Sequence, residues 1–130
     1  MAVVTETLSA GGVTVTASKT LSPSDQVLVI GGPFTVATAE TDKQLAVGGV
    51  DVSQLVACYV HSTAAVTLET NANDASGGNT LTLAADVAYV WCTGKPDSCK
   101  FTADITTMYC TNASGSSATI NMIFVQDGTP

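Results

Sequence analysis

The chain has 130 residues and a formal net charge of −7, with 11 acidic residues, 4 lysines and no arginine. Threonine occurs 20 times and valine 16 times, whereas glutamine, a good helix former, occurs 4 times. This composition predicts an all-β protein, and the acidic balance argues against a nucleic-acid partner because phosphates would be repelled. The length suits a single domain over residues 1–130.

Short strand-like segments follow one another along the chain, separated by turns rich in Gly, Asn, Asp and Ser. Residues 13–16, 66–69 and 80–83 alternate apolar with polar side chains, which predicts one buried and one wet face. The segments "QVLVIGG", "LVACYV" and "VAYVWC" are apolar on both faces, so their second face should be covered by a loop or a neighbouring subunit. The predicted strands are residues 3–8, 12–17, 26–30, 34–38, 43–47, 54–60, 64–70, 79–84, 87–92, 105–111 and 117–125.

No long helix is needed between these strands, although "SPSDQ" and "DVSQL" could each form a single turn. Many short strands without crossover helices predict an antiparallel β-sandwich, jelly-roll-like or Greek-key-like, of about 8–11 strands. A closed barrel is the second choice.

No targeting or membrane segment is visible in the sequence. The start, "MAVVTETLSAGG", lacks both a basic region and the apolar run of roughly 7–15 residues that a secretory signal needs. No stretch approaches the ~18–20 apolar residues of a membrane span. We therefore expect no membrane partner and synthesis in the cytoplasm.

The four cysteines could form disulfides, bind metal or stay as thiols. Cys92 and Cys99 flank the polar turn "TGKPDS", so a hairpin could bring them within bridging distance, and a disulfide and two free thiols are both open. Cys58 and Cys110 lie in apolar runs and are predicted to be buried thiols. Zinc is disfavoured because no C-x₂-C pair occurs and His61, the single histidine, would point away from Cys58 on a strand.

The loop "ETNANDASGGN" is the best candidate for a metal site, because hard cations such as calcium bind carboxylate and amide oxygens. Its spacing matches no EF-hand loop, and the same residue types occur in ordinary solvated hairpin loops. We therefore expect no metal and no other cofactor. The weak candidate ligands are Glu69, Asn71, Asn73 and Asp74.

Catalytic residues are scarce. His61 precedes Ser62 and Thr63, but no G-x-S-x-G motif occurs, so a hydrolase triad is not expected. The acidic residues fall mostly in turns, and the few aromatic rings fall mostly in apolar strands, which disfavours a glycosidase. The sequence therefore predicts that the protein is not an enzyme.

Two segments carry a resemblance to a known group: "AAVTLETNANDASGGNTLTLAADVAYVW" and "ITTMYCTNASGSSATINMIFVQDGTP". In each, an alternating strand, a Gly/Asn/Ser turn and a further strand follow one another, and "LTLAA" and "TNASGS" stand at the turns. The segments cover residues 64–92 and 105–130 and resemble small structural proteins of tailed-bacteriophage virions. The shared motifs describe hairpins and include no catalytic site.

This resemblance implies a capsid decoration (cement) protein, made in the bacterial cytoplasm and bound to the outside of the capsid. Its expected partners are the major capsid protein and further copies of itself, in a homotrimer or another homo-oligomer. Residues 1–10 are the candidate extended arm, with Val3, Val4 and Thr5 as candidate assembly contacts. The alternative function is a carbohydrate- or receptor-binding sandwich on a tail or fibre, for which an exposed Trp91 would be the sign.

Overall fold

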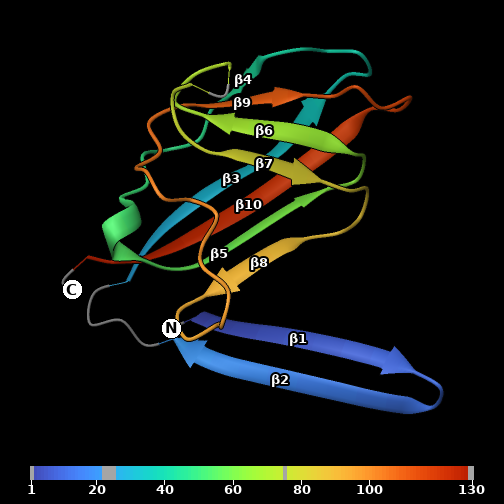
Figure 1. The fold of residues 1–130 in the computed structure, drawn as a ribbon, viewed down its shortest axis with the longest axis vertical. Helices are drawn as coiled ribbons and strands as arrows, with labels where there is room; N and C mark the ends of the chain where they lie inside the picture. Colours follow the sequence, from blue (N-terminus) through green and yellow to red (C-terminus); the bar gives the residue numbers. More distant parts are fainter. Residues whose placement is uncertain (1, 22–25, 75, 129–130) are drawn as a thin grey trace.

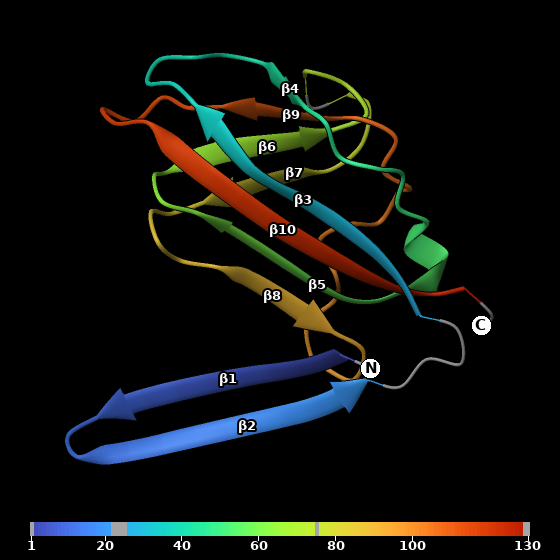
Figure 2. The same ribbon diagram turned by 180° about the vertical axis from the view of Figure 1, so that it is seen from behind.

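The computed structural model describes residues 2–21, 26–74 and 76–128, which form an almost entirely β structure (Figure 1). Two four-stranded sheets pack face to face, and a two-stranded hairpin stands beside them (Figure 2). The elements of the described residues are β1 (Ala2–Ala10), β2 (Val13–Leu21), β3 (Gln26–Val36), β4 (Lys43–Leu45), the 3-10 turn η1 (Val52–Gln54), β5 (Leu55–Ser62), β6 (Val66–Thr70), β7 (Thr80–Leu83), β8 (Tyr89–Cys92), β9 (Met108–Thr111) and β10 (Ala118–Asp127).

The two large sheets differ in strand length, and we call them the long sheet and the short sheet. The long sheet has the order β3-β10-β5-β8, and the short sheet has the order β4-β9-β6-β7. Every pairing within them is antiparallel. The predicted all-β sandwich is therefore confirmed, while its jelly-roll or Greek-key connectivity stays a prediction.

Strand β3 differs from the sequence prediction, which placed a turn at "GGP" between two strands. The structure continues one strand through Gly32 and Pro33, because β3 pairs along β10 from Asp127 to Ala118. The register shifts next to Ile120, opposite the glycines, and this irregularity accommodates them. Long-range pairing thus overrides a local turn signal. The single turn expected at "DVSQL" is present as η1, whereas residues 22–25, within the turn expected at "SPSDQ", lie outside the described residues.

The main core fills the space between the long and short sheets. Its side chains alternate inward from both sheets, and burying each large one contributes about 1.5–3 kcal/mol. Phe101, from the loop before β9, packs edge-on against Phe124 of β10 with ring centroids 5.5 Å apart. The fully buried side chains with the largest volumes are Phe101, Phe124, Leu68, Ile105, Met108, Ile120 and Met122.

Residues 2–10 of the candidate N-terminal arm form strand β1 of a hairpin. Strands β1 and β2 pair without interruption from Ala2 opposite Leu21 to Ala10 opposite Val13. Gly11 and Gly12 form the two-residue turn, both with positive φ (58° and 81°), a conformation that glycine adopts without steric cost. Met1 lies outside the described residues.

Candidate interaction surface

The β1–β2 hairpin has two chemically different faces, because side chains alternate along each strand. One face carries cross-strand pairs of hydroxyl groups, which we call the hydroxyl ladder. The opposite face carries the aliphatic side chains Val4, Leu8, Val13, Val15 and Leu21, and we call these the apolar stripe. Glu6 and Lys19 lie on the same face, between the two ends of the stripe. The hydroxyl oxygens of the ladder pair as Thr5 with Ser18 at 2.9 Å, Thr7 with Thr16 at 3.1 Å and Ser9 with Thr14 at 2.8 Å.

The apolar stripe is covered at one end of the hairpin and uncovered at the other. At the root, Ala2, Val4 and Leu21 pack in a second apolar cluster on the long sheet. At the tip, residues 8–15, the side chains of the stripe have no cover: Leu8 is 73% exposed, Val13 63% and Val15 64%. In both ribbon views the hairpin lies beyond β8 and its turn points away from the N-terminus (Figures 1 and 2).

Two lysines fasten the root to the loop that follows β8. Lys95 donates a hydrogen bond from Nζ to Glu6 Oε1 at 2.6 Å, and Lys19 Nζ donates to the carbonyl oxygen of Thr93. The hydrogen bond to Glu6 raises the pKa of Lys95. The root is therefore held by polar contacts as well as by apolar packing.

The outer face of the long sheet, which faces away from the main core, carries two apolar rows. Strand registers align one residue from each of the four strands in each row. The covered row lies mostly under the hairpin root, and the open row is largely solvent-exposed, with Ile30 66%, Ile123 42% and Tyr59 41% exposed. The covered row is Leu28, Val125, Ala57 and Cys92, and the open row is Ile30, Ile123, Tyr59 and Val90.

A groove of about 470 Å³ lies between the hairpin root and the open row of this face. Among the described residues, its lining contains no charged side chain. The groove brings together the three candidate assembly contacts from the N-terminal segment and three members of the open row. These residues are Val3, Val4 and Thr5 on the hairpin, and Tyr59, Val90 and Ile123 on the sheet.

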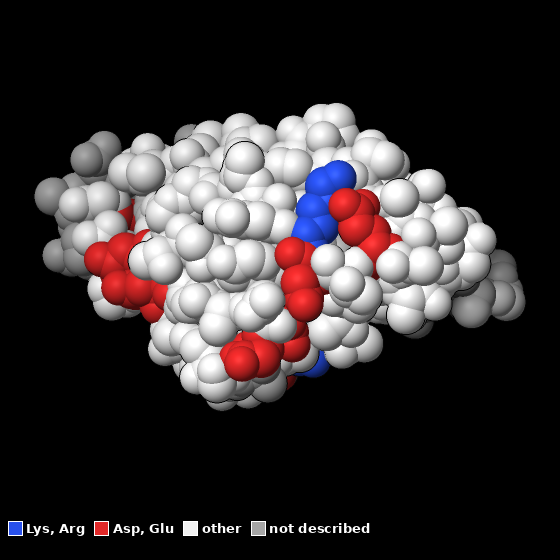
Figure 3. Space-filling view, turned by 90° about the horizontal axis from the view of Figure 1, so that it is seen from above, with Lys and Arg blue, Asp and Glu red and all other residues white. Residues whose placement is uncertain are grey.

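Charge is distributed unevenly between the hairpin and the rest of the molecule. Figure 3 shows the side of the molecule far from the hairpin, where acidic side chains gather with few lysines. In the hairpin, by contrast, no charged residue occurs between Glu6 and Lys19. The tip and the groove are therefore uncharged apolar surfaces on a protein of net charge −7.

The candidate metal ligands do not converge on one point. Asn71 uses its amide to hold a neighbouring loop: Oδ1 accepts from Thr106 N at 2.8 Å, and Nδ2 donates to the Asp104 carbonyl at 2.7 Å. Asp74 accepts from the backbone N–H of Ser76 at 3.0 Å, and the hydrogen bonds from Ser76 lower its pKa. Within the described residues, no group of three or more His, Cys, Asp and Glu side chains could hold a metal ion.

The other two candidate ligands have no common partner with these. Glu69 lies within β6, between Thr80 of β7 and Tyr109 of β9 in the sheet register. Asn73 is exposed in the loop that follows. The loop is thus an ordinary polar connection whose amide groups organise its neighbours.

Of the two alternatives left open for Cys92 and Cys99, the structure has two free thiols, which lie on opposite sides of β8. All four cysteines fall within the described residues and are free. Cys92 packs with Val125 under the hairpin root, whereas Cys99 packs against the main core with its Sγ 3.8 Å from Tyr89 Oη. Alternation along β8 turns Tyr89 and Trp91 toward the core and Cys92 away from it.

Cys58 and Cys110 are buried thiols, as predicted. Burial, with a smaller effect from the neighbouring Cys99, raises the pKa of the Cys58 thiol. Burial also raises the pKa of Cys110 to about 11. Both groups therefore stay protonated and unreactive near neutral pH.

His61 and Trp91, the side chains considered for catalysis and for glycan binding, each contact other parts of the fold. His61 Nε2 lies 3.5 Å from Asp86 Oδ1, while the buried Ser62, on the other face of β5, donates from Oγ to the Ala64 carbonyl at 2.7 Å. Trp91 is half-buried against the main core, and its Nε1–H donates to the Asp97 carbonyl at 3.1 Å. These contacts give each side chain a structural role.

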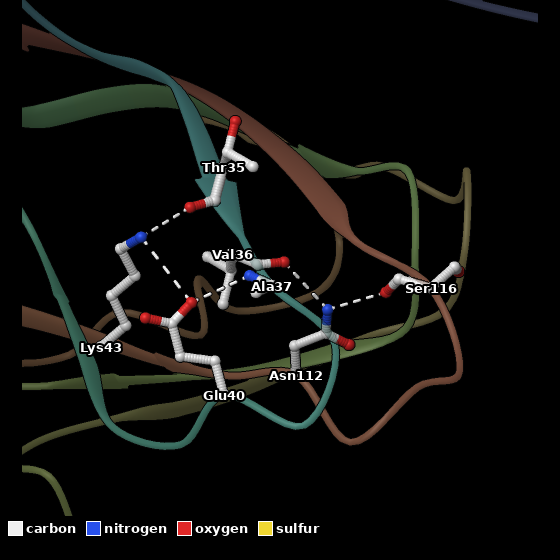
Figure 4. Close-up of polar contacts among 7 residues, drawn as sticks. All are labelled: Thr35, Val36, Ala37, Glu40, Lys43, Asn112 and Ser116. Carbon is white, nitrogen blue, oxygen red and sulfur yellow. Dashed lines mark hydrogen bonds and ion pairs between the residues drawn. The ribbon is translucent and has the colours of Figure 1, made fainter.

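Asn112 is a structural residue that the sequence analysis did not single out, although it stands in the quoted "TNASGS" turn. Its side chain is fully buried, and Nδ2 donates to the carbonyl oxygens of Val36 at 3.1 Å and Ser116 at 2.9 Å (Figure 4). Its Oδ1 accepts from the backbone N–H of Ser114 at 3.0 Å. In the sequence, this structural role is signalled by an Asn two residues before a Ser in a turn, and that pattern is common in loops.

No protein-family model, curated protein or solved structure matches this chain. Among the described residues, no helix is both long enough and apolar enough to cross a membrane. The structure itself shows an all-β sandwich with an amphipathic hairpin whose tip is uncovered.

Proposed function

We propose that this protein is a structural component of a virion, a capsid decoration protein that binds the outer surface of a phage capsid. In this role it stabilises the capsid across the joints between subunits. The observation that carries the proposal is the uncovered apolar stripe at the hairpin tip, formed by Leu8, Val13 and Val15. A surface of this kind gains free energy only when another macromolecule covers it.

The magnitude of that gain supports an assembly role. Covering one large aliphatic side chain contributes about 1.5–3 kcal/mol before the entropic cost of association is subtracted. Three such side chains on one hairpin, repeated at every copy on a capsid lattice, add up over the whole particle. Because the decoration protein binds the assembled capsid and not its separated subunits, capsid opening must also break these contacts.

The remaining side chains fit the same proposal. The polar groups of the described loops mostly hold other loops, as Asn71 and Asn112 do, and are not gathered around a cavity. The large apolar rings Phe101 and Phe124 lie in the core. A rigid sandwich that presents one apolar hairpin is well suited to contact and poorly suited to catalysis.

The experiment is to purify nuclease-resistant particles from the source and to quantify this chain against the most abundant protein in them. A ratio near one to one supports the proposal, because only a lattice component occurs at that number. A few copies per particle would move the protein to a vertex, neck or tail. Absence from particles would overturn the proposal.

A second arm of the experiment measures stabilisation. Particles stripped of this chain should release their nucleic acid at a lower temperature than intact ones, and adding purified chain should restore the original temperature. Equal release temperatures with and without the chain would show that it does not stabilise the capsid.

A further inference from the structure

We propose that the hairpin tip of one copy binds in the groove of a second copy, so that the chains associate head to tail. The tip is the uncovered end of the apolar stripe, with Leu8, Val13 and Val15. The groove lies between the hairpin root and the open row, and Tyr59 and Ile123 line it. This inference goes beyond the proposed function, in which the same tip contacts the capsid: free copies bind one another through the tip and exchange this contact for the capsid on attachment. It is tested on the purified chain alone.

The first argument is chemical continuity with a contact already present within the chain. At the root, Ala2, Val4 and Leu21 of the hairpin pack on Ala57 and Val125 of the long sheet. The sheet surface continues beyond this contact as the open row, and the same face of the hairpin is apolar again beyond Glu6 and Lys19, at the uncovered tip. The uncovered tip of one copy and the open row of another can therefore form the same kind of apolar contact as the root and the sheet form within one chain.

The second argument is geometric, because a chain cannot place its own tip in its own groove. Residues 2–5 of β1 form one wall of the groove. The tip belongs to the same paired hairpin, and residue 10 is about 20 Å along the strand from residue 4 at ~3.3 Å per residue. A hairpin tip that enters the groove must therefore come from another molecule.

The third argument is electrostatic. Two copies that each carry a net charge of −7 repel one another, so a contact between them is favoured where neither surface is charged. The described part of the groove lining holds no charged residue, and none occurs in the hairpin between Glu6 and Lys19. A volume of about 470 Å³ lies within the range of roughly 300–1,000 Å³ that is typical of ligand pockets, enough for several aliphatic side chains.

Each copy has one tip and one groove, so the contact is heterologous and must generate a closed ring or an open chain of molecules. A ring satisfies every tip and every groove. The homotrimer expected from the phage resemblance is one such ring.

The test is light scattering of the purified full chain after gel filtration, over a series of concentrations. Wild type should be oligomeric. Val15→Asp places a charge on the apolar stripe and should weaken association by roughly 30-fold or more, as for an interface hot spot. The matched control is Thr16→Asp, which adds the same charge one residue away on the hydroxyl ladder and should leave the oligomer intact.

The groove is tested in the same way. Ile123→Asp charges the groove and should also give monomers, whereas Asn121→Asp, at an exposed position of β10 outside the groove lining, should not. Circular dichroism and thermal melting confirm that each variant is folded. Monomeric wild type at every concentration, or oligomers that survive both Val15→Asp and Ile123→Asp, would overturn the inference.

Mixing the two defective variants separates head-to-tail contact from any symmetric one. Val15→Asp retains an intact groove and Ile123→Asp retains an intact tip, so an equimolar mixture has one functional junction per pair. The mixture should form a one-to-one dimer and nothing larger. A mixture that stays monomeric contradicts the inference. Because no particles are present, this result is independent of the copy number that tests the proposed function.

Discussion

Cys92 and Cys99 lie on opposite sides of strand β8, Cys92 under the hairpin root and Cys99 against the main core beside Tyr89. Seven residues apart in sequence, they are separated by a sheet in the fold. The thiol that shares a side of the sheet with Cys99 is Cys58, whose pKa is raised by burial and by Cys99. This arrangement makes the reactivity of the four thiols predictable.

We therefore expect that peptide mapping of the unreduced protein finds no bridge between Cys92 and Cys99. Under native conditions Cys99, which is partly exposed, should react first with an alkylating reagent. Cys58 and Cys110 should react only after unfolding, because they are buried and their thiols stay protonated. Rapid native labelling of Cys58 would show that β5 does not lie in the core.

The Asn112→Ala substitution should lower the free energy of unfolding by about 2–4 kcal/mol. It removes the partners of the Val36 and Ser116 carbonyls and of the Ser114 N–H in a buried turn, and each buried group left unpaired costs about 1–3 kcal/mol. Urea unfolding with an unchanged m-value measures the loss. Asn73→Ala, at an exposed loop position, is the matched control and should change stability by less than about 0.5 kcal/mol. Equal effects of the two substitutions would mean that the Asn112 contacts do not stabilise the fold.

Stability should fall as the pH rises from 9 to 11, in part through Cys110. Burial raises the pKa of this thiol from 9.0 to about 11, so in that window the unfolded chain releases a proton that the folded chain keeps. Its contribution is present below pH 9 and is lost as the pH rises toward 11. Cys110→Ala should flatten this decline in the free energy of unfolding, measured by urea titration at each pH.

The control for this experiment is Met108→Leu, which changes a buried side chain of the same strand without removing a titratable group. It should leave the slope of stability against pH unchanged. A slope that is the same in wild type and Cys110→Ala would contradict the assignment of this effect to Cys110.

Trp91 should show blue-shifted fluorescence that added glycans do not change. Its ring is half-buried against the main core, and its Nε1–H is already bonded to the Asp97 carbonyl. Titration with a panel of mono- and oligosaccharides measures this directly. Saturable quenching by one glycan would instead favour a carbohydrate-binding module.

Deleting residues 2–21 should leave a folded sandwich that no longer attaches to particles. The hairpin contributes no residue to the main core, and its loss uncovers Ala57, Cys92 and Val125, which should cost roughly 2–4 kcal/mol. Deleting β1 alone would instead leave β2 without its hydrogen-bonding partner. Circular dichroism measures folding and co-sedimentation with particles measures attachment. Retained co-sedimentation would exclude the hairpin as the attachment element.

The sequence by itself determined the all-β class and nearly every strand. Alternation between apolar and polar side chains is a local property of a strand, and residues 66–69 and 80–83 show it without any knowledge of their neighbours. The predicted strands at 3–8 and 12–17 likewise lie within β1 and β2, although their pairing as a hairpin was not predicted. The segments that are apolar on both faces became β3, β5 and β8, whose outer face is covered in part by the hairpin root.

Only the tertiary structure decided what that second surface is. Ile30, Ile123, Tyr59 and Val90 come from four strands far apart in the chain, and they form one row because of the registers among β3, β10, β5 and β8. Register between distant strands depends on the packing of the whole sheet, so a pattern read along a single strand cannot set it. The same dependence on long-range packing explains why β3 continues through "GGP" and why Cys92 and Cys99 lie apart. It also explains why the N-terminal segment forms one wall of a groove.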